Sequence, residues 1–443
     1  MTGGKPWKSI ARFALPVLAG SLLQQLYNTV DAIIVGRFAG EASLSAVGTT
    51  TSFVFFFLAI AIGFSSGNGV VVAQHFGAGN KKGIRENAST GIVFLLTLGL
   101  VSTIVSLLLS KPVFVYLIKV KDSYMQQTLQ YFNIYALGLI FQYGYNIFSS
   151  ILRAIGDSAA TLYFLLLSSI INIGLDIVFV KNFNWGVSGA AFATDISQAL
   201  SFIAAYIYMT GKYPVLKFKL KDYKWRGKMV ADTVKIGSPI SLQLVVVSVG
   251  FSFIQRAVND FGQAMTASFT VGQRIEMYLN LPCNALQTTM ATYTGQNVGA
   301  NRIDRVKKGT MQALLISLIM TIFISALVWT FAADISALFG LSSKAAAYSL
   351  SHIRTVALVN LILAVYIPLF GVFQGSNHPT IPMFTAIGAL SARVITTYLF
   401  RYNPLFGESI IWWNGLFGFG TGFIISWSYY LSGKWKKNAK IGE

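Results

Sequence analysis

Residues 24–37 read QQLYNTVDAIIVGR and place an aspartate, Asp31, inside an apolar run that begins near residue 12. Gln24, Asn28 and Asp31 recur at intervals of four and three residues, so on a helix they form one polar stripe. Lipid offers this stripe no hydrogen-bond partner, and the stripe must therefore face protein or water. An ionisable group at such depth indicates a functional site, although a polar contact that joins two helices is the simpler alternative.

The composition around this stretch is that of a polytopic membrane protein. Of 443 residues, 54% are hydrophobic and only 11% are charged, which is too little charge for a soluble chain. The formal net charge of +19 would suit nucleic acid only on a soluble domain with a basic face, and none is present, so we expect no nucleic-acid partner. The single cysteine, Cys283, excludes an intramolecular disulfide, and no Cys/His cluster has zinc-ligand spacing.

Twelve apolar windows of about 20 residues predict twelve transmembrane helices and an all-α membrane protein. The windows are 12–36, 45–73, 89–110, 127–151, 160–181, 186–210, 233–257, 266–294, 310–332, 347–373, 380–400 and 408–432. Lys and Arg concentrate in the segments of one side, including the C-terminal Lys434, Lys436, Lys437 and Lys440. The positive-inside rule therefore predicts a multi-pass protein of the cell membrane with both termini in the cytoplasm.

The sequence repeats itself in two halves of six helices. A basic linker at 212–232 separates the first half, 1–211, from the second, 233–443. Pro16 returns as Pro239, and QHFGA at 74–78 returns as QNVGA at 296–300. Because six is even, both halves enter the membrane from the same side, as parallel internal repeats. Secondary transporters are commonly built in this way, with the substrate site between the halves.

Two carboxyl groups fall at the same predicted depth. Asn172 and Asp176 share one face of the fifth helix because four residues separate them. Asp31 and Asp176 each precede the outer end of their helix by about five residues, or roughly 7 Å. Close carboxyls in a low dielectric do not both ionise cheaply, so the pair should hold a proton or bind a monovalent cation such as Na⁺. The alternative is that each acid pairs separately with a basic residue or a backbone group for structure.

The sixth helix adds two polar residues. Thr194 and Asp195 come nine and ten residues after Trp185, which places them nearer the midplane. Thr194 is a candidate neutral oxygen ligand for Na⁺, and Asp195 is a candidate extension of a proton path. Adjacent helical residues point about 100° apart, so both side chains cannot squarely face one cavity, and Asp195 ranks second.

The second half carries one acid within its spans, Glu276, with Gln273 and Arg274 close in sequence. Arg274 and Glu276 form either a structural ion pair or part of a site for cationic substrates. Methionine and aromatic side chains that face a cleft, such as Met277, suit flat organic cations through stacking, cation–π and thioether contacts. Most aromatic side chains in the spans nevertheless have ordinary packing or lipid contacts.

Catalytic motifs are missing from the sequence. It contains no Gly-x-Ser-x-Gly, no His-Glu-x-x-His and no phosphate-binding loop, and its three histidines are scattered near helix ends. We therefore expect no enzyme and no ATP-driven pump.

Seven segments, in this order over twelve helices, resemble the multidrug and toxic compound extrusion (MATE) family, and its DinF-like prokaryotic branch looks most similar. They are QLYNTVDAIIVGR (25–37), AQHFGAGNKK (73–82), LRAIGD (152–157), NIGLDIVFV (172–180), WGVSGAAFAT (185–194), QRIE (273–276) and TGQNVGANRIDRVKKG (294–309). The resemblance implies two six-helix lobes around a central cleft. It also implies export of cationic or amphipathic organic compounds, by alternating access, in exchange for H⁺ or Na⁺.

The resemblance further implies which residues act. The expected ion-coupling residues are Gln24, Asp31, Asn172, Asp176 and Thr194, of which Asp31, Asn172, Asp176 and Thr194 are candidate Na⁺ ligands. The expected substrate-binding residues are Asn28, Tyr135, Asn146, Gln273, Glu276 and Met277. An acid that other branches carry in the seventh helix is absent, because that segment reads SLQLVVVSVGFSF.

Other functions fit less well. A lipid-linked oligosaccharide flippase of the same superfamily is the main alternative, but it needs a large basic cavity, and basic residues avoid the spans apart from Arg274, Arg354 and Arg393. A channel or an intramembrane enzyme needs a selectivity ring or a catalytic set, and neither is visible. We expect a monomer in the lipid bilayer that needs no cofactor besides its coupling ion.

Overall fold

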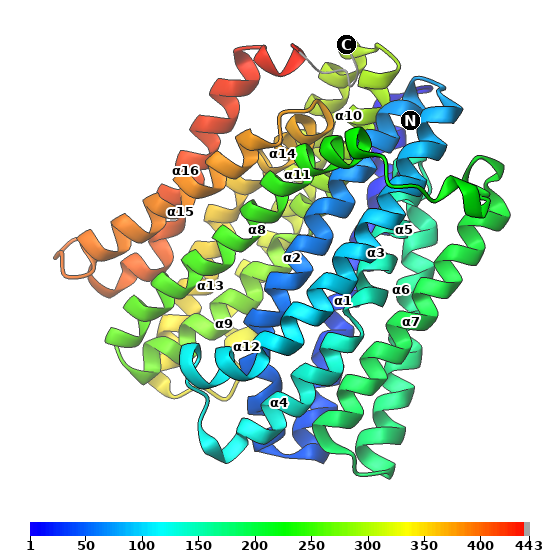
Figure 1. The fold of residues 1–443 in the computed structure, drawn as a ribbon. Coiled ribbons are helices and arrows are strands. Elements are labelled where there is room, and N and C mark those ends of the chain that lie inside the picture. Colours follow the sequence, from blue (N-terminus) through cyan, green and yellow to red (C-terminus); the bar gives the residue numbers. More distant parts are fainter. Residues whose placement is uncertain (438–443) are drawn as a thin grey trace. The chain divides into compact units, whose positions relative to one another are not determined.

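The computed structural model describes residues 1–437 (Figure 1), and Lys440 of the basic C-terminal segment lies outside these residues. They fold almost wholly into helices, as predicted, with no strand among them. The α-helices are α1 (Pro6–Ile34), α2 (Glu41–Gly77), α3 (Lys81–Pro112), α4 (Asp122–Leu137), α5 (Leu139–Ala154), α6 (Ser158–Asp176), α7 (Gly186–Lys212), α8 (Gly227–Asp260), α9 (Gln263–Leu279), α10 (Leu281–Gly299), α11 (Ile303–Thr330), α12 (Ala332–Ala337), α13 (Ser343–Ala364), α14 (Ile367–Gly375), α15 (Thr380–Phe400) and α16 (Ile410–Leu431).

Shorter helical turns complete the described chain. Three π-helical turns, η1 (Val35–Ala39), η2 (Val113–Leu117) and η3 (Ile177–Asn182), continue α1, α3 and α6. One-turn 3-10 helices are η4 (Pro214–Leu216), η5 (Leu220–Asp222), η6 (Gly407–Ser409) and η7 (Lys434–Lys436).

Within residues 1–437 the long helices form the twelve predicted rods, three of which are broken. The pairs α4–α5, α9–α10 and α13–α14 each make one rod, and only α12 lies outside the set. Pro282 and Pro368 stand in the first turns of α10 and α14, where a missing N–H costs nothing, so the breaks fall just before them. Eight spans among the described residues are long and apolar enough to cross a membrane by composition alone.

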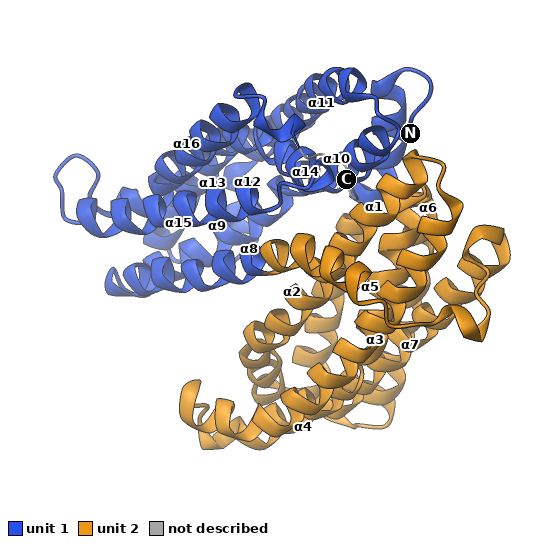
Figure 2. Cartoon of the chain, turned by 45° about the horizontal axis from the view of Figure 1, so that its top comes forward, with its two compact units in different colours: residues 1–18, 242–443 blue, residues 19–241 orange. Residues whose placement is uncertain are grey.

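The chain divides into two compact units (Figure 2). Unit 1 comprises residues 1–18 and the chain from 242 onward, and unit 2 comprises residues 19–241. The division falls inside two uninterrupted helices, because α1 passes from unit 1 to unit 2 after Leu18 and α8 leaves unit 2 after Ser241. Pro16 and Pro239 stand two residues before these two points.

The backbone records the internal repeat. Left-handed residues occur at matching turns of the two halves, 221 or 222 positions apart, and L side chains rarely adopt this conformation. The pairs are Gly40 and Gly262, Gly79 and Asn301, Lys119 and Gly340, and Gly156 and Asn377. Packing repeats as well: α2 with α5, α2 with α4 and α6 with α7 in unit 2 correspond to α10 with α14, α9 with α13 and α15 with α16 in unit 1.

α1 and α8, the two helices that pass from one unit to the other, each have a first part that packs within the unit where the helix starts. Ile10 and Ala14 of α1 are buried in unit 1 with Leu286 of α10. In unit 2, a Cβ atom at Gly67 of α2 would lie 2.6 Å from the backbone nitrogen of Gly237, so the absence of a side chain lets α8 approach closely. These contacts fix the first turns of both helices.

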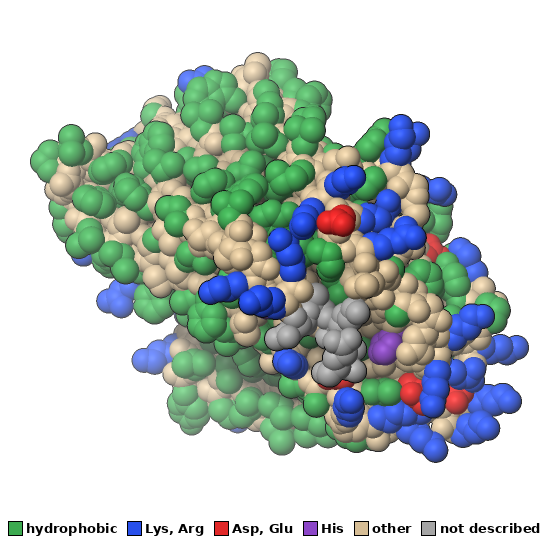
Figure 3. Space-filling view, turned by 90° about the horizontal axis from the view of Figure 1, so that it is seen from above, with side chains coloured by type: hydrophobic (Ala, Val, Ile, Leu, Met, Phe, Trp, Pro, Cys, Tyr) green, Lys and Arg blue, Asp and Glu red, His purple; other side chains and the backbone are tan. Residues whose placement is uncertain are grey.

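Basic side chains gather on the end face seen in Figure 3. In unit 2 the segment between α7 and α8 contributes the exposed Lys217, Lys219, Lys221 and Lys224. This segment is tied down by an ion pair from Arg85 Nη2 to Asp222 Oδ2 at 2.5 Å.

Candidate functional site

Asp31 and Asp176 each stand where an α-helix changes into a π-helical turn. Asp31 lies in the last turn of α1, which η1 continues, and Asp176 is the last residue of α6, which η3 continues. The turns η1 and η3 pack against each other. Single π-helical turns interrupt the regular side-chain spacing of a helix and are frequent at functional sites. Here they bring the ends of two helices that are far apart in sequence to one place.

The carboxyl groups of Asp31 and Asp176 lie side by side and interact directly. Asp176 is fully buried. Across residues 1–437, no hydrogen-bond donor reaches either carboxylate oxygen of Asp176 or Oδ1 of Asp31. The Asp176 carboxylate has lost its hydration without gaining a donor, and two ionised carboxylates at this range repel each other. Ionisation of both acids at the same time is therefore unfavourable.

Asn172 and Thr194 extend the same group. Asn172 lies one turn before Asp176 on α6, and its Nδ2 donates to Oγ1 of Thr194 on α7 over 3.4 Å. This bond leaves the amide oxygen of Asn172, which is buried, without any donor in the described chain. We call the side-chain oxygens of Asp31, Asn172, Asp176 and Thr194 the oxygen cluster.

The composition of the oxygen cluster limits what it can bind. Oxygen atoms are the ligands of hard cations, whereas transition metals favour sites that include His or Cys. No three residues of the types His, Cys, Asp and Glu gather to hold a metal ion anywhere in residues 1–437. Two carboxyls with an amide and a hydroxyl offer oxygen ligands alone, the kind that hard cations prefer.

Tyr135 and Asn146 lie on either side of the break in the fourth rod. The Tyr135 hydroxyl donates to Oε1 of Gln142 over 3.1 Å, and Asn146 Nδ2 donates to the Gln142 carbonyl oxygen over 2.8 Å. Tyr135 is buried and stacks with Tyr131 at a ring separation of 6.0 Å. Its hydroxyl group is close enough to Asp31 to interact with it electrostatically. Tyr135 thus lies beside the oxygen cluster rather than in it, whereas the contact of Asn146 is with the helix backbone.

Asp195 faces the same break and not the oxygen cluster. A Cβ atom at Gly138, between α4 and α5, would lie 1.9 Å from Oδ1 of Asp195, so only glycine fits there. Asp195 is buried and interacts electrostatically with Tyr131 and Tyr135. Its direction differs from that of Thr194, as adjacent positions on a helix require.

Gln24 and Asn28 are exposed, whereas Asp31 is half-buried. The two amides therefore lie outside the oxygen cluster although they share the stripe of Asp31 on α1. Since lipid cannot satisfy an amide, an exposed amide on a membrane helix requires an aqueous surface.

In unit 1, Glu276 pairs with a residue that the sequence did not indicate. Its Oε1 is 3.4 Å from Nη1 of Arg393, and both side chains are only 8% exposed. The expected pairing with Arg274 is wrong: Arg274 is exposed, because positions two apart on a helix point in nearly opposite directions. Of the other predicted substrate-binding residues on α9, Gln273 is half-buried and Met277 is exposed.

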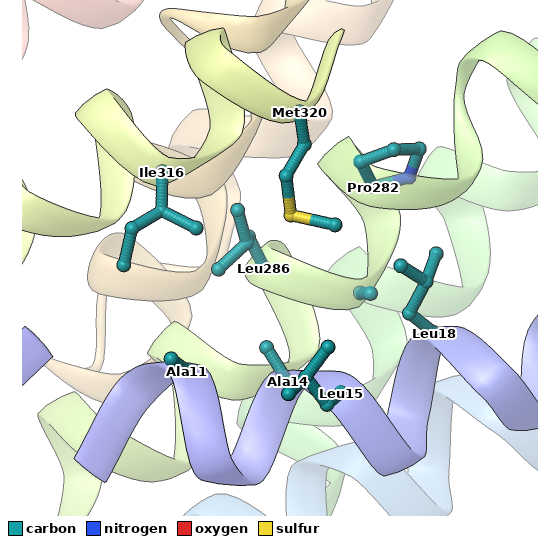
Figure 4. A pocket seen from close by; sticks show the side chains of 9 residues that line it. Ala11, Ala14, Leu15, Leu18, Pro282, Leu286, Ile316 and Met320 are labelled. Carbon is teal, nitrogen blue, oxygen red and sulfur yellow. The ribbon is translucent and has the colours of Figure 1, made fainter. Parts of the chain in front are cut away.

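Unit 1 also has an apolar cavity of about 90 Å³ beside the start of α1 (Figure 4). Its walls come from α1, α10 and α11, and the side chains of Leu18, Leu286 and Met320 point toward it. Its lining is formed by apolar side chains, which offer no group for ion binding or catalysis.

Comparison with known proteins finds a matching family model and similar chains. The sequence model of the MatE family matches residues 16–178 and 239–399, one match in each repeat. Probable multidrug resistance protein YpnP of Bacillus subtilis (strain 168) is 26% identical over 98% of this chain and 97% of its own. Multidrug export protein MepA of Staphylococcus aureus (strain NCTC 8325 / PS 47) is 24% identical over 92% of this chain and 90% of its own.

Solved structures share the fold. A MOP superfamily transporter from Pyrococcus furiosus Vc1, described as having a binding pocket of reverse polarity, superposes with a TM-score of 0.92 at 25% identity, covering 98% of this chain and 97% of its own. An outward-facing multidrug resistance MATE family transporter gives the same TM-score of 0.92 and 25% identity over 98% of this chain and 97% of its own.

Proposed function

The chain belongs to the MatE family of membrane transporters, and from this premise we propose that it is a secondary active antiporter. It exports cationic or amphipathic organic compounds in exchange for H⁺ or Na⁺. The observation that supports this most directly is the oxygen cluster of unit 2, in which Oδ1 of Asp31, Oδ1 of Asn172 and both carboxylate oxygens of Asp176 have no donor among the described residues.

The oxygen cluster explains how an ion gradient drives the transport of another compound. A proton or Na⁺ bound between Asp31 and Asp176 removes the repulsion of two buried carboxylates, and its release restores that repulsion. The ion therefore prefers the conformation in which the two acids are close. A tenfold preference for one of two conformations supplies ~1.4 kcal/mol. Successive binding and release then exposes the transport path alternately to the two sides of the membrane.

Exchange requires the ion and the exported compound to weaken each other's binding. Linkage makes this effect reciprocal: the factor by which Na⁺ or H⁺ weakens drug binding equals the factor by which the drug weakens ion binding. The exposed amides of Gln24 and Asn28 lie on the same helix as Asp31. Helix α1 therefore carries polar groups for the coupling ion and for the exported compound.

The same proposal includes an orientation. The end face rich in Lys and Arg in Figure 3 is cytoplasmic by the positive-inside rule, which places both termini there. The protein acts as a monomer in the cell membrane, needs no cofactor besides its coupling ion, and binds no nucleic acid.

A flippase for lipid-linked sugars is less well supported. It needs several unpaired basic groups for a pyrophosphate. Of the basic side chains within spans, Arg274 and Arg354 are exposed, and Arg393 is neutralised by Glu276. These three residues do not form a basic cavity.

Transport in proteoliposomes tests the proposal. A fluorescent organic cation should move against its own gradient when a pH gradient or a Na⁺ gradient is imposed, and each gradient is applied separately. Accumulation that depends on neither gradient would rule out antiport, and transport only of a lipid-linked sugar would favour the flippase.

A further inference from the structure

The internal repeat gives the oxygen cluster of unit 2 a counterpart in unit 1. Counting from the left-handed residues Gly156 and Asn377, the residue sixteen positions on is Asn172 in α6 and Arg393 in α15. The residue twenty positions on is Asp176 in α6 and Thr397 in α15. An arginine thus replaces the amide, and a hydroxyl replaces an acid.

The two remaining positions also change. Counting from the matching prolines Pro16 and Pro239, the residue fifteen positions on is Asp31 in α1 and the fully buried Ile254 in α8. Thr194 and Gly418 are each the ninth residue of their helices, α7 and α16. The contact between these two positions is present in both units. In unit 2, Asn172 donates a hydrogen bond to Thr194, and in unit 1 a Cβ atom at Gly418 would lie 2.2 Å from Cγ of Arg393. The glycine makes room for the arginine.

Arg393 is held as a bound cation is held. Its Nε donates to Oδ1 of Asn414 over 2.7 Å, and its Nη1 donates to Oε1 of Glu276 over 3.4 Å. The rings of Phe251 and Phe419 lie 5.1 and 5.2 Å from the guanidinium carbon. A carboxylate, an amide oxygen and two aromatic faces are together the ligands that an organic cation needs.

Two further ionisable groups, Tyr366 and His352, interact with this pair. Tyr366 interacts electrostatically with both Arg393 and Glu276, and His352, which interacts with Arg393, lies between the rings of Phe269 and Trp412 at 5.6 and 5.7 Å. Tyr366 also interacts electrostatically with Cys283. Within the described part of unit 1, the ion pair of Glu276 is made with Arg393, a cation that is part of the chain.

We propose that Arg393 is a tethered cation that fills, in the second repeat, the place that a coupling ion takes in the first. An arginine in a protein neither loses its proton nor leaves. Glu276 is thereby permanently neutralised, and unit 1 takes up no coupling ion. This inference rests on the proposed function, since it names the unit whose acids exchange ions during transport.

Removing the tether tests the inference. In Arg393→Met, Glu276 becomes a buried acid without a partner and should take up one additional monovalent cation per chain. The measurements on purified protein are equilibrium binding of ²²Na⁺ at pH 9 and proton uptake between pH 9 and pH 5. Wild-type values for both in Arg393→Met would overturn the inference.

Two control variants isolate the charge. Glu276→Gln/Arg393→Met lacks both charges and should return to the wild-type ion count. Arg354→Met removes an exposed arginine, which lies 5.6 Å from the Trp329 ring, and should leave the ion count unchanged. A gain of the same size in either control variant would also contradict the inference.

A second variant serves if Arg393→Met does not fold. Glu276→Gln leaves the buried Arg393 without its counter-ion, and the protein should then bind one ³⁶Cl⁻ per chain that wild type does not bind. If Glu276→Gln binds no more chloride than wild type, Arg393 does not occupy an ion-binding site.

The same measurement in an Asp31→Asn background separates this inference from the proposed function. An additional cation in Asp31→Asn/Arg393→Met, relative to Asp31→Asn, supports the tethered cation whatever Asp31 does. If Asp31→Asn alone binds as many ions as wild type, the coupling site of unit 2 is wrong while the tethered cation stands.

Discussion

The carboxyl groups of Asp176 and Asp31 interact directly at a place where, within residues 1–437, no hydrogen-bond donor reaches either carboxylate oxygen of Asp176. We expect Asp31→Asn and Asp176→Asn each to reduce gradient-driven efflux to background, because one acid alone no longer gives a pair that an ion must neutralise. Since each substitution also removes a repulsion, the melting temperature should be unchanged or higher. Efflux in proteoliposomes and thermal unfolding in detergent measure the two effects.

Asp304→Asn is the matched control, because this carboxylate is 92% exposed. It should transport like wild type. Normal efflux in Asp31→Asn or Asp176→Asn, or a large fall in melting temperature in both, would show that the acids serve structure instead.

Thr194 provides a neutral oxygen, which a sodium ion needs and a proton does not. Thr194→Val keeps the shape of the side chain, so the Na⁺ concentration for half-maximal transport should rise about tenfold, or ~1.4 kcal/mol in binding. Transport driven by a pH gradient should keep its rate. Equal losses under both gradients would contradict the assignment of Thr194 as an ion ligand.

Gly138 leaves room for Asp195 at the break between α4 and α5. In Gly138→Ala the new Cβ atom would lie 1.9 Å from Oδ1 of Asp195, and the displacement should destabilise the protein by about 1–3 kcal/mol. Gly48→Ala is the matched control, because nothing lies within 4 Å of a Cβ atom there and alanine favours a helix. Thermal unfolding of the two variants compares them, and equal melting temperatures would count against the close approach.

Asp157 precedes α6 and holds α7 to it. The hydroxyl groups of Tyr213 and Tyr208 donate to Oδ2 over 2.6 and 2.9 Å, and Lys212 Nζ donates over 3.1 Å. Burial opposes ionisation of the carboxyl group, but these bonds, with one from the Ala160 N–H, outweigh it and lower the pKa of Asp157.

A lowered pKa means that the carboxylate stabilises the fold above the pKa of the unfolded chain and that this contribution is lost as pH falls through the folded pKa. Asp157→Asn should therefore destabilise the protein at pH 7 by about 1–3 kcal/mol. The difference from wild type should shrink below about pH 4. Thermal unfolding between pH 3 and pH 8 measures it, and a difference that does not change with pH would contradict this account.

Cysteine labelling tests the orientation. In a Cys283→Ser background, cysteines at the exposed positions Lys221 and Lys307 should react only from the cytoplasm, and one at the exposed Lys121 only from outside. An impermeant maleimide applied to intact cells or to inverted vesicles distinguishes the sides. Labelling of the Lys221 position in intact cells would reverse the topology.

The rods and the repeat were predictable because they depend on local pattern. A run of apolar residues long enough for the bilayer is visible in one window, and Gly156 and Asn377 mark matching turns through residue type alone. Counting residues to the helix ends gave Asp31 and Asp176 the same depth, but it did not show that the ends of their two helices meet. The π-helical turns that bring these ends together leave no comparable pattern in the sequence.

The pairing of Glu276 was not predictable from its neighbours. Arg274 is close in sequence but lies on another face of α9, whereas Arg393 is 117 positions away and reaches Glu276 only through helix packing. The signal was in the repeat, because counting from the matching turns places Arg393 at the position of Asn172. The exposure of Gln24 and Asn28 likewise depends on which neighbours cover α1, and spacing alone does not give it.

The passage of α1 and α8 between the units has a consequence for biosynthesis. Residues 19–241 form unit 2, which is complete once the ribosome has added the start of α8, whereas the start of α1 packs against α10 and must wait for it. The first helix to enter the membrane is thus among the last to complete its packing. The chain can be expressed as two polypeptides split within residues 212–232. The first then carries the start of α1, which packs in unit 1, and the second carries the start of α8, which packs in unit 2. Neither fragment alone should give a stable product, and their coexpression should restore both.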